Sequence, residues 1–236
     1  MEPVTRDRLG RHTFLQPRQG YRFSIDSVLL AHFAPVVKGP VADLGAGCGV
    51  LSVLLHARGA AGPYTAVEID PLAADCCRRN LAAAGVPGQV LTHDLRRPHP
   101  ELKPGAFALA ITNPPFTKAG HGRVSPHPAR ARARQELALA GEDLWRLAAE
   151  LLPRGGRLAL CWPPARLVEA LTGLETVRLT PRRLRLVHGR IDRPASLALI
   201  EAVKHAGNEL TVEPPLVVYA QGQRYSPEVE AIYRSL

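Results

Sequence analysis

The sequence predicts an α/β fold in which a mostly parallel sheet carries helices on both faces. From Val41 onward, short apolar runs alternate with longer segments of helical periodicity, and this alternation is typical of repeated strand–helix units. A glycine-rich turn, Gly45-Ala46-Gly47-Cys48-Gly49, joins the first of these strands to its helix. With 236 residues, the chain has the length of one globular domain with appendages rather than of two domains.

Five buried strands can be placed from short apolar runs that end at turn-forming residues. They are expected at Val41–Leu44, Tyr64–Ile69, Gln89–Thr92, Phe107–Thr112 and Arg157–Trp162. Helices are expected in the intervals, after Gly49 as far as Gly59, from Pro71 through Leu81, and between Leu137 and Leu152. Proline at a first helical position and glycine or proline after the last turn support these bounds.

The remainder of the chain predicts one more helix and the end of the sheet. The helix follows Pro164 and runs to about Leu171. Three β-like segments come after it, at Thr176–Leu179, Arg185–Val187 and Leu197–Val203. Because a turn with glycine and proline separates the last two segments, we expect them to pair antiparallel and to complete the sheet.

Positive charge is the most unusual feature of the composition. Lys and Arg total 30 against 21 Asp and Glu, a formal net charge of +9. The stretch 117–136 has five cations and one acid, and the stretch 178–193 has six arginines and one acid, so the two together account for the excess. Such clusters favour a polyanionic partner such as nucleic acid, although a general arginine bias gives the same composition.

Cysteine spacing and apolar content restrict the class of protein further. The four cysteines have no Cys-x-x-Cys spacing, which argues against a metal site or a disulfide framework and predicts buried free thiols in a reducing cytoplasm. The polar stretch Met1–Phe14 lacks the apolar core of a signal peptide. No run approaches the roughly 20 apolar residues of a membrane helix. We therefore expect a soluble cytoplasmic protein.

The glycine-rich turn is the first candidate for a binding site. Its glycines allow a sharp turn and a close approach of backbone to a ligand. Glu68 lies 21 residues after Gly47, at the end of the second expected strand, where a carboxylate can accept both ribose hydroxyls of a nucleotide-like cofactor. The spacing is Gly-x-Gly-x-Gly, unlike that of dinucleotide enzymes, and Asp43 nearby suits a cationic cofactor better than a pyrophosphate.

The second candidate site is Asn113-Pro114-Pro115-Phe116, which directly follows the fourth expected strand. The two prolines end the strand because neither has a backbone N–H to donate. An amide oxygen and a carbonyl can then accept both hydrogens of a planar NH2 group, while the aromatic ring covers its plane. A plain structural turn is the alternative, since Pro163-Pro164 and Pro214-Pro215 also occur in this chain.

Both candidates resemble motifs of one superfamily, the class I S-adenosylmethionine-dependent methyltransferases. The segment Asp43–Gly49 resembles motif I, and Asn113–Phe116 resembles motif IV of the enzymes that methylate amines. The resemblance implies a Rossmann-like fold with a mostly parallel seven-stranded sheet, an antiparallel C-terminal strand and S-adenosylmethionine as cofactor. It also implies that Asp94, after the third strand, binds the adenine amino group, although a turn or cap aspartate is nearly as plausible.

A narrower resemblance lies in Leu15–Ala31, which is similar to the N-terminal signature of bacterial tRNA adenine-N6 methyltransferases that act on valine tRNA beside the anticodon. The stretches Gly122–Pro126 and Pro214–Tyr219 fit the same subfamily, so the likeness spans about 15–233. It implies that residues 1–33 cover the cofactor site and that 34–236 form the methyltransferase domain, within a single globular domain. Phe116 departs from the subfamily, where many relatives carry Tyr, so that no phenolic hydroxyl is available.

The resemblance assigns roles by residue. Catalysis is expected from Asn113, Pro114 and Phe116, and no metal is expected. The cofactor is expected to contact Tyr21, Phe23, Asp26, Asp43, Gly45, Ala46, Gly47, Glu68, Ile69, Asp94, Leu95 and Asn113. Charge and position suggest RNA contacts for Lys118, Arg123, Arg130, Arg134, Arg182, Arg183 and Arg185. The resulting hypothesis is transfer of a methyl group to the exocyclic N6 amine of an adenosine in tRNA, the substrate and partner.

Three other functions remain open at this level. A glutamine carboxamide of a translation release factor also offers a planar NH2, but those enzymes carry a longer helical domain ahead of motif I, and 42 residues precede Asp43 here. A guanine-N2 methyltransferase of ribosomal RNA would present a similar exocyclic amine. A protein of another class, an RNA-binding module on a methyltransferase fold, would be expected to lose the acid or the tetrapeptide. The sequence does not distinguish a monomer from a homodimer.

Overall fold

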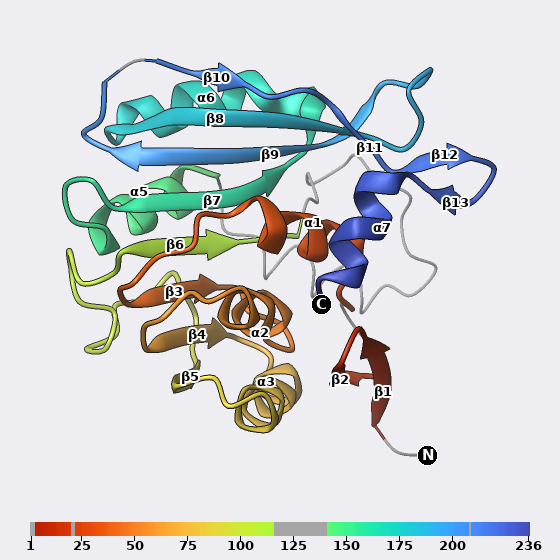
Figure 1. Ribbon diagram of the computed structural model, residues 1–236. Coiled ribbons are helices and arrows are strands. Elements are labelled where there is room, and N and C mark those ends of the chain that lie inside the picture. The colour runs from red at the N-terminus through yellow and green to blue at the C-terminus, as the bar shows by residue number, and fades with distance from the viewer. Residues whose placement is uncertain (1–2, 20–21, 116–140, 208) are drawn as a thin grey trace.

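The computed structural model describes residues 3–19, 22–115, 141–207 and 209–236. A mixed sheet forms the centre of this part of the chain (Figure 1). Across the described residues it has nine strands in the order β10-β8-β9-β7-β6-β3-β4-β5, with β11 also paired to β8. The strands are β3 (Val41–Leu44), β4 (Tyr64–Glu68), β5 (Gly88–Thr92), β6 (Leu109–Thr112), β7 (Arg157–Trp162), β8 (Leu179–His188), β9 (Ala195–Lys204), β10 (Thr211–Val212) and β11 (Leu216–Val217).

The central strands confirm the expected parallel arrangement. β3 pairs parallel with both β4 and β6, and the pairs β4–β5 and β6–β7 are parallel as well. β9 runs antiparallel to β7 and β8, as expected for the pair that completes the sheet. The sheet exceeds the seven strands implied by the resemblance because two-residue strands, β10 and β11, add to the outer edge of β8.

One expected strand is wrong. The segment Thr176–Leu179 was expected to be β-like, but Thr176 ends a helix and Leu179 begins β8. Between them Arg178 adopts a left-handed conformation with φ 60°. The segment looked strand-like because Thr176 and Val177 are β-branched. Tertiary packing of the helix overrides this local preference.

Helices cover both faces of the sheet (Figure 1). They are α1 (Ile25–Phe33), α2 (Val50–Ala57), α3 (Pro71–Ala83), α5 (Gly141–Leu151), the 3-10 turn η1 (Pro164–Arg166), α6 (Leu167–Thr176) and α7 (Pro227–Arg234). Buried side chains of α1, α2, α3 and α7 share one apolar cluster, and those of α5 and α6 share a second cluster with Trp162. No helix in the described part of the chain is long and apolar enough to cross a membrane.

An N-terminal hairpin that the sequence pattern did not indicate packs against α3. It consists of β1 (Val4–Leu9) and β2 (His12–Pro17), paired antiparallel. The buried side chain of Asn80 in α3 joins this hairpin to the glycine-rich turn. Its Oδ1 accepts from the Leu15 N–H at 2.8 Å, and its Nδ2 donates to the carbonyls of Leu15 at 2.9 Å and Cys48 at 2.8 Å.

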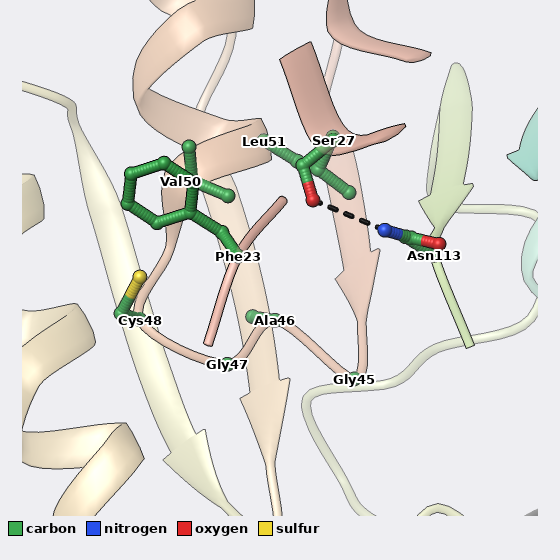
Figure 2. Close-up of a pocket in the computed structure, with 9 residues that line it drawn as sticks. All are labelled: Phe23, Ser27, Gly45, Ala46, Gly47, Cys48, Val50, Leu51 and Asn113. Atoms are coloured by element: carbon green, nitrogen blue, oxygen red, sulfur yellow. Dashed lines mark hydrogen bonds between the residues drawn. The ribbon is translucent and has the colours of Figure 1, made fainter. Parts of the chain in front are cut away.

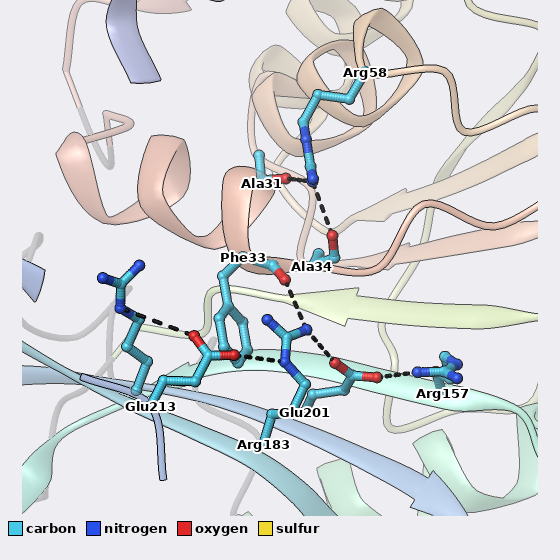
Figure 3. A network of polar contacts seen from close by, with 9 residues as sticks. Ala31, Phe33, Ala34, Arg58, Arg157, Arg183, Glu201 and Glu213 are labelled. Atoms are coloured by element: carbon cyan, nitrogen blue, oxygen red, sulfur yellow. Dashed lines mark hydrogen bonds and ion pairs between the residues drawn. The ribbon is translucent and has the colours of Figure 1, made fainter. Parts of the chain in front are cut away.

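A buried carboxylate organises the antiparallel half of the sheet (Figure 3). Glu201 in β9 is fully buried and forms ion pairs with Arg157 and Arg183, the latter at 2.6 Å. Arg183 also pairs with Glu213 at 2.7 Å, and its Nη1 donates to the Phe33 carbonyl at 3.3 Å. The network therefore connects β7, β8 and β9 to the last turn of α1.

We predict that replacing Glu201 with Ala destabilises the fold by about 3 kcal/mol, because it removes the charged hydrogen bonds from Arg157 and Arg183 to a buried carboxylate and leaves Arg183 with Glu213 alone. Urea unfolding monitored by circular dichroism measures the loss. Glu142→Ala is the matched control, since its ion pair with Arg146 at 3.7 Å is exposed and should change stability by about 0.5 kcal/mol or less. A Glu201→Ala variant as stable as the control would contradict the structural role of the network.

Candidate active site

The two candidate motifs meet at one edge of the sheet. The glycine-rich turn follows β3, Glu68 ends β4, and Asn113 follows β6. Because these three strands are adjacent and parallel, their carboxyl ends lie together. A pocket at this edge is lined by residues from the N-terminal segment, the turn, α2 and the end of β6, as Figure 2 shows: Phe23, Ser27, Gly45, Ala46, Gly47, Cys48, Val50, Leu51 and Asn113.

The glycines of the turn have two different roles. Gly47 has a positive φ of 56°, and a Cβ added there, as at Gly45, would have no atom within 4 Å. The backbone is therefore open to a ligand on that side. A Cβ on Gly49 would instead lie 2.6 Å from Leu81 Cδ1 and 2.7 Å from Cys77 Sγ, so this glycine is required for packing of α2 against α3.

Glu68 is held in place by backbone donors. Its Oε2 accepts from the Gly47 N–H at 2.8 Å, and its Oε1 accepts from the Asp70 N–H at 2.9 Å. Burial raises the pKa of this carboxyl group, and the two backbone hydrogen bonds oppose the rise. The carboxylate thus fixes the turn and is oriented before any ligand binds, while its contact with ribose stays a prediction.

Asp43 has a structural role that the sequence did not reveal. It is fully buried, and its Oδ2 accepts from Ser52 N–H at 3.2 Å and Ser52 Oγ–H at 2.7 Å, inside α2. Its Oδ1 has no hydrogen-bond partner among the described residues. Burial raises the pKa of Asp43 to about 6. The side chain is absent from the pocket lining, and its expected contact with the cofactor remains untested.

Asp94 lies after β5 and is bound by a close neighbour. Arg96 donates through Nε to Oδ1 at 2.9 Å and through Nη2 to Oδ2 at 2.7 Å. This pairing lowers the pKa of Asp94 to about 2. The sequence did not reveal that Arg96 pairs with Asp94. The contact of Asp94 with adenine stays a prediction. Ile69 and Leu95 are half-buried and lie outside the lining of the pocket.

The N-terminal segment contributes Phe23 to the pocket. The Phe23 N–H donates to Gln16 Oε1 at 3.0 Å, and its ring meets Phe14 edge-on with centroids 5.3 Å apart. Asp26 follows in the first turn of α1, where burial raises the pKa of its carboxyl group, but it does not line the pocket. Tyr21, also expected at the cofactor, lies outside the described residues.

Asn113 occupies the side of the pocket opposite α2 and is buried. Its Nδ2 donates to Ser27 Oγ at 3.0 Å, a contact between residues 86 positions apart in the chain. Sequence reasoning missed Ser27, whose only signal was its place beside Asp26 in the N-terminal signature. Pro114 is half-buried next to Asn113. Phe116 lies outside the described residues.

The arginines expected to contact RNA in β8 have intramolecular partners. Arg182 lies 3.6 Å from Glu209, Arg183 lies 2.6 Å from Glu201, and Arg185 Nη2 lies 2.7 Å from Glu228. Sequence reasoning missed these pairs because the acids come from distant segments. RNA contacts at the three arginines stay a prediction. The other four expected cations, Lys118, Arg123, Arg130 and Arg134, lie outside the described residues.

We predict that Asp43→Asn changes how stability depends on pH. A folded-state pKa of about 6, above the ordinary 3.8, means that the folded protein binds the proton more tightly, so wild-type stability falls as pH rises through this range. Asn does not titrate, so the variant should gain about 1.4 kcal/mol relative to wild type between pH 5 and pH 8. Urea unfolding at both pH values measures the difference, and a pH-independent difference would refute the assignment.

Residues 24–169 match the methyltransferase small domain family. A Porphyromonas gingivalis protein named tRNA1(Val) (adenine(37)-N6)-methyltransferase is 32% identical over 79% of this chain and 74% of its own length. A Tolumonas auensis protein of the same name is 31% identical over 95% and 96%. A crystal structure described as a predicted O-methyltransferase from Agrobacterium tumefaciens has a TM-score of 0.71 at 25% identity, over 89% of this chain and 96% of that one. The chain therefore belongs to the methyltransferase small domain family.

Proposed function

We propose that the protein transfers a methyl group from S-adenosylmethionine to the N6 amine of an adenosine in tRNA, with valine tRNA, beside the anticodon, as the substrate. The observation that carries the proposal is the placement of the Asn113 amide in the same pocket as the open glycine-rich turn. An acceptor for a planar amine thus lies next to a site suited to a nucleoside. The names of relatives that match over most of their length support tRNA as the polyanionic partner.

The residues around the pocket support the proposed cofactor. The turn is open above Gly45 and Gly47, so that a ligand can contact its backbone. Glu68 lies outside the lining of the pocket but is bonded to the turn, and in this proposal its oriented carboxylate accepts from two ribose hydroxyls. Phe23 supplies an apolar wall from the N-terminal segment. Bound S-adenosylmethionine would supply an electrophilic methyl group whose departure leaves a neutral thioether. The proposed set of cofactor contacts is completed by Tyr21, Asp26, Asp43, Ala46, Ile69, Asp94, Leu95 and Asn113.

Catalysis in this proposal consists of binding and orienting the amine. The target base leaves its stack, as for other enzymes that act on a base, and Phe116 stacks on it. Asn113 Oδ1 and the Pro114 carbonyl accept the two N6 hydrogens. These acceptors favour a nitrogen that is becoming tetrahedral, so they bind the transition state more tightly than the planar amine. No general base is needed, because the proton can pass to water after transfer.

One experiment distinguishes this substrate from its alternatives. The protein is incubated with labelled S-adenosylmethionine and, separately, with total tRNA, small ribosomal subunits or release factor, and the products are digested and identified. We expect N6-methyladenosine in valine tRNA beside the anticodon. Label in N2-methylguanosine of ribosomal RNA, or only in protein, would refute the proposed substrate. Binding of tRNA without any methyl transfer would support an RNA-binding module instead.

We predict that Asn113→Ala lowers kcat by about 100-fold or more, because removing one oriented acceptor removes stabilisation specific to the transition state. Cofactor affinity should stay within a few-fold of wild type. Single-turnover assays give the rate, and calorimetry with S-adenosylhomocysteine gives the affinity. Near wild-type turnover would show that this amide does not act on the amine.

We predict the opposite pattern for Glu68→Ala. The variant should weaken cofactor binding by roughly 10- to 100-fold, as expected for the loss of hydrogen bonds to a charged group, with kcat at saturating cofactor changed only a few-fold. Calorimetry measures the affinity. Glu68→Gln is the matched variant, since it keeps one oxygen and the side-chain size and should fall between wild type and Ala. Unchanged affinity in both variants would exclude Glu68 from the cofactor site.

A further inference from the structure

The contact between Ser27 and Asn113 joins the N-terminal segment to the proposed catalytic amide. Ser27 lies in the first turn of α1 and is 2% exposed, and Asn113 is 6% exposed. The Asn113 Nδ2 atom lies 3.0 Å from Ser27 Oγ. Figure 2 shows the amide nitrogen turned toward Ser27 and the amide oxygen on the opposite side. In this arrangement the serine hydroxyl accepts from the nitrogen end of the amide, and the oxygen end points away from the serine.

This distinction matters because the two ends of an asparagine amide are nearly equal in size and opposite in chemistry. The oxygen accepts hydrogen bonds, and the nitrogen only donates them. A methyl-accepting amine brings two N–H donors, so only the oxygen can bind it. A reversed amide would place donor against donor, and the amine would lose one of its two acceptors. A catalytic asparagine therefore needs a group that holds one orientation.

The structure also explains why Ser27 can hold its position. The Ser27 N–H donates to the carbonyl of Ser24, the N-cap of α1, at 3.2 Å. At the other end of the helix, Arg58 Nη1 donates to the Ala34 carbonyl at 2.8 Å, and Arg183 Nη1 donates to the Phe33 carbonyl at 3.3 Å (Figure 3). Bonds at both ends restrict movement of α1 along its axis, and hence movement of the serine hydroxyl.

We propose that Ser27 is a positioning residue that accepts a hydrogen bond from Asn113 Nδ2 and so presents Asn113 Oδ1 to the substrate amine. This inference rests on the proposed N-methyltransferase function. Ser27 itself does not contact the amine. Loss of its hydroxyl should release the amide from the observed orientation, which lowers the rate of transfer and leaves cofactor binding unchanged.

A double-mutant cycle tests the proposal with Ser27→Ala, Asn113→Ala and the combination, using tRNA and saturating S-adenosylmethionine. We expect Ser27→Ala alone to lower kcat roughly tenfold, about the effect of losing one hydrogen bond. Affinity for S-adenosylhomocysteine should stay within twofold. In the Asn113→Ala background, Ser27→Ala should have no further effect on kcat. Ser196→Ala, which removes a hydroxyl bonded to the Val187 carbonyl in the sheet, is the matched control and should leave kcat unchanged.

Two results would overturn the proposal. An equal effect of Ser27→Ala on kcat in both backgrounds would show that the serine acts independently of the amide. A loss of cofactor affinity with unchanged kcat would make Ser27 a cofactor contact, since it also lines the pocket. Thermal unfolding of every variant identifies any general loss of structure, and such a loss would reduce kcat and affinity together.

A spectroscopic measurement separates failure of this inference from failure of the proposed function. The side-chain NH2 signal of Asn113 in a ¹⁵N–¹H correlation spectrum is assigned by its absence from the Asn113→Ala variant. The signal should shift in Ser27→Ala protein without any substrate and stay in place in Ser196→Ala protein. An unshifted signal would refute the hydrogen bond even if the enzyme methylates tRNA. A shifted signal in a protein that methylates no adenosine would refute the function alone.

Discussion

The candidate site depends on one buried amide, that of Asn80, which bonds three backbone groups at once. Two of these groups belong to Leu15 in the N-terminal hairpin, and the third is the Cys48 carbonyl in the glycine-rich turn. Backbone groups that are buried without partners cost about 1–3 kcal/mol each. By bonding these three groups, the Asn80 side chain removes that penalty where the hairpin packs against the turn. The hairpin in turn positions Phe23 at the pocket through Gln16 and Phe14.

Parallel strand pairing brings the remaining parts together. The turn after β3, the carboxylate at the end of β4 and the amide after β6 come from three adjacent strands. One hydrogen bond of 2.8 Å joins the turn to the carboxylate, and another of 3.0 Å holds the amide. Glu68 holds the turn and Ser27 holds Asn113, so neither group has to be ordered when a ligand arrives. Groups oriented in advance need little reorganisation during a reaction, which is the main source of electrostatic catalysis.

The accuracy of the sequence predictions depended on how local each signal was. The strands of the parallel half and the helix at Pro71 were predicted because apolar runs and proline mark them within a few residues. Glu68 and Asn113 were brought to one edge as expected, since their places at strand ends follow from the same pattern. Asn80 bonds Leu15 and Cys48, which lie 65 and 32 positions away, and Ser27 bonds Asn113, 86 positions away. No local pattern marks such contacts. The helix at Thr176 was misjudged because packing outweighed β-branched composition.

The ion pairs of β8 change what the high arginine content implies about RNA binding. A protein gains affinity for a polyanion by releasing the counterions that surround the polyanion. Each protein cation contributes only to the extent that it displaces such a counterion. Arg182, Arg183 and Arg185 already face carboxylates of Glu209, Glu201 and Glu228. Because these carboxylates neutralise them, the arginines of the strand should release fewer counterions than their number suggests, and RNA affinity should depend less steeply on salt.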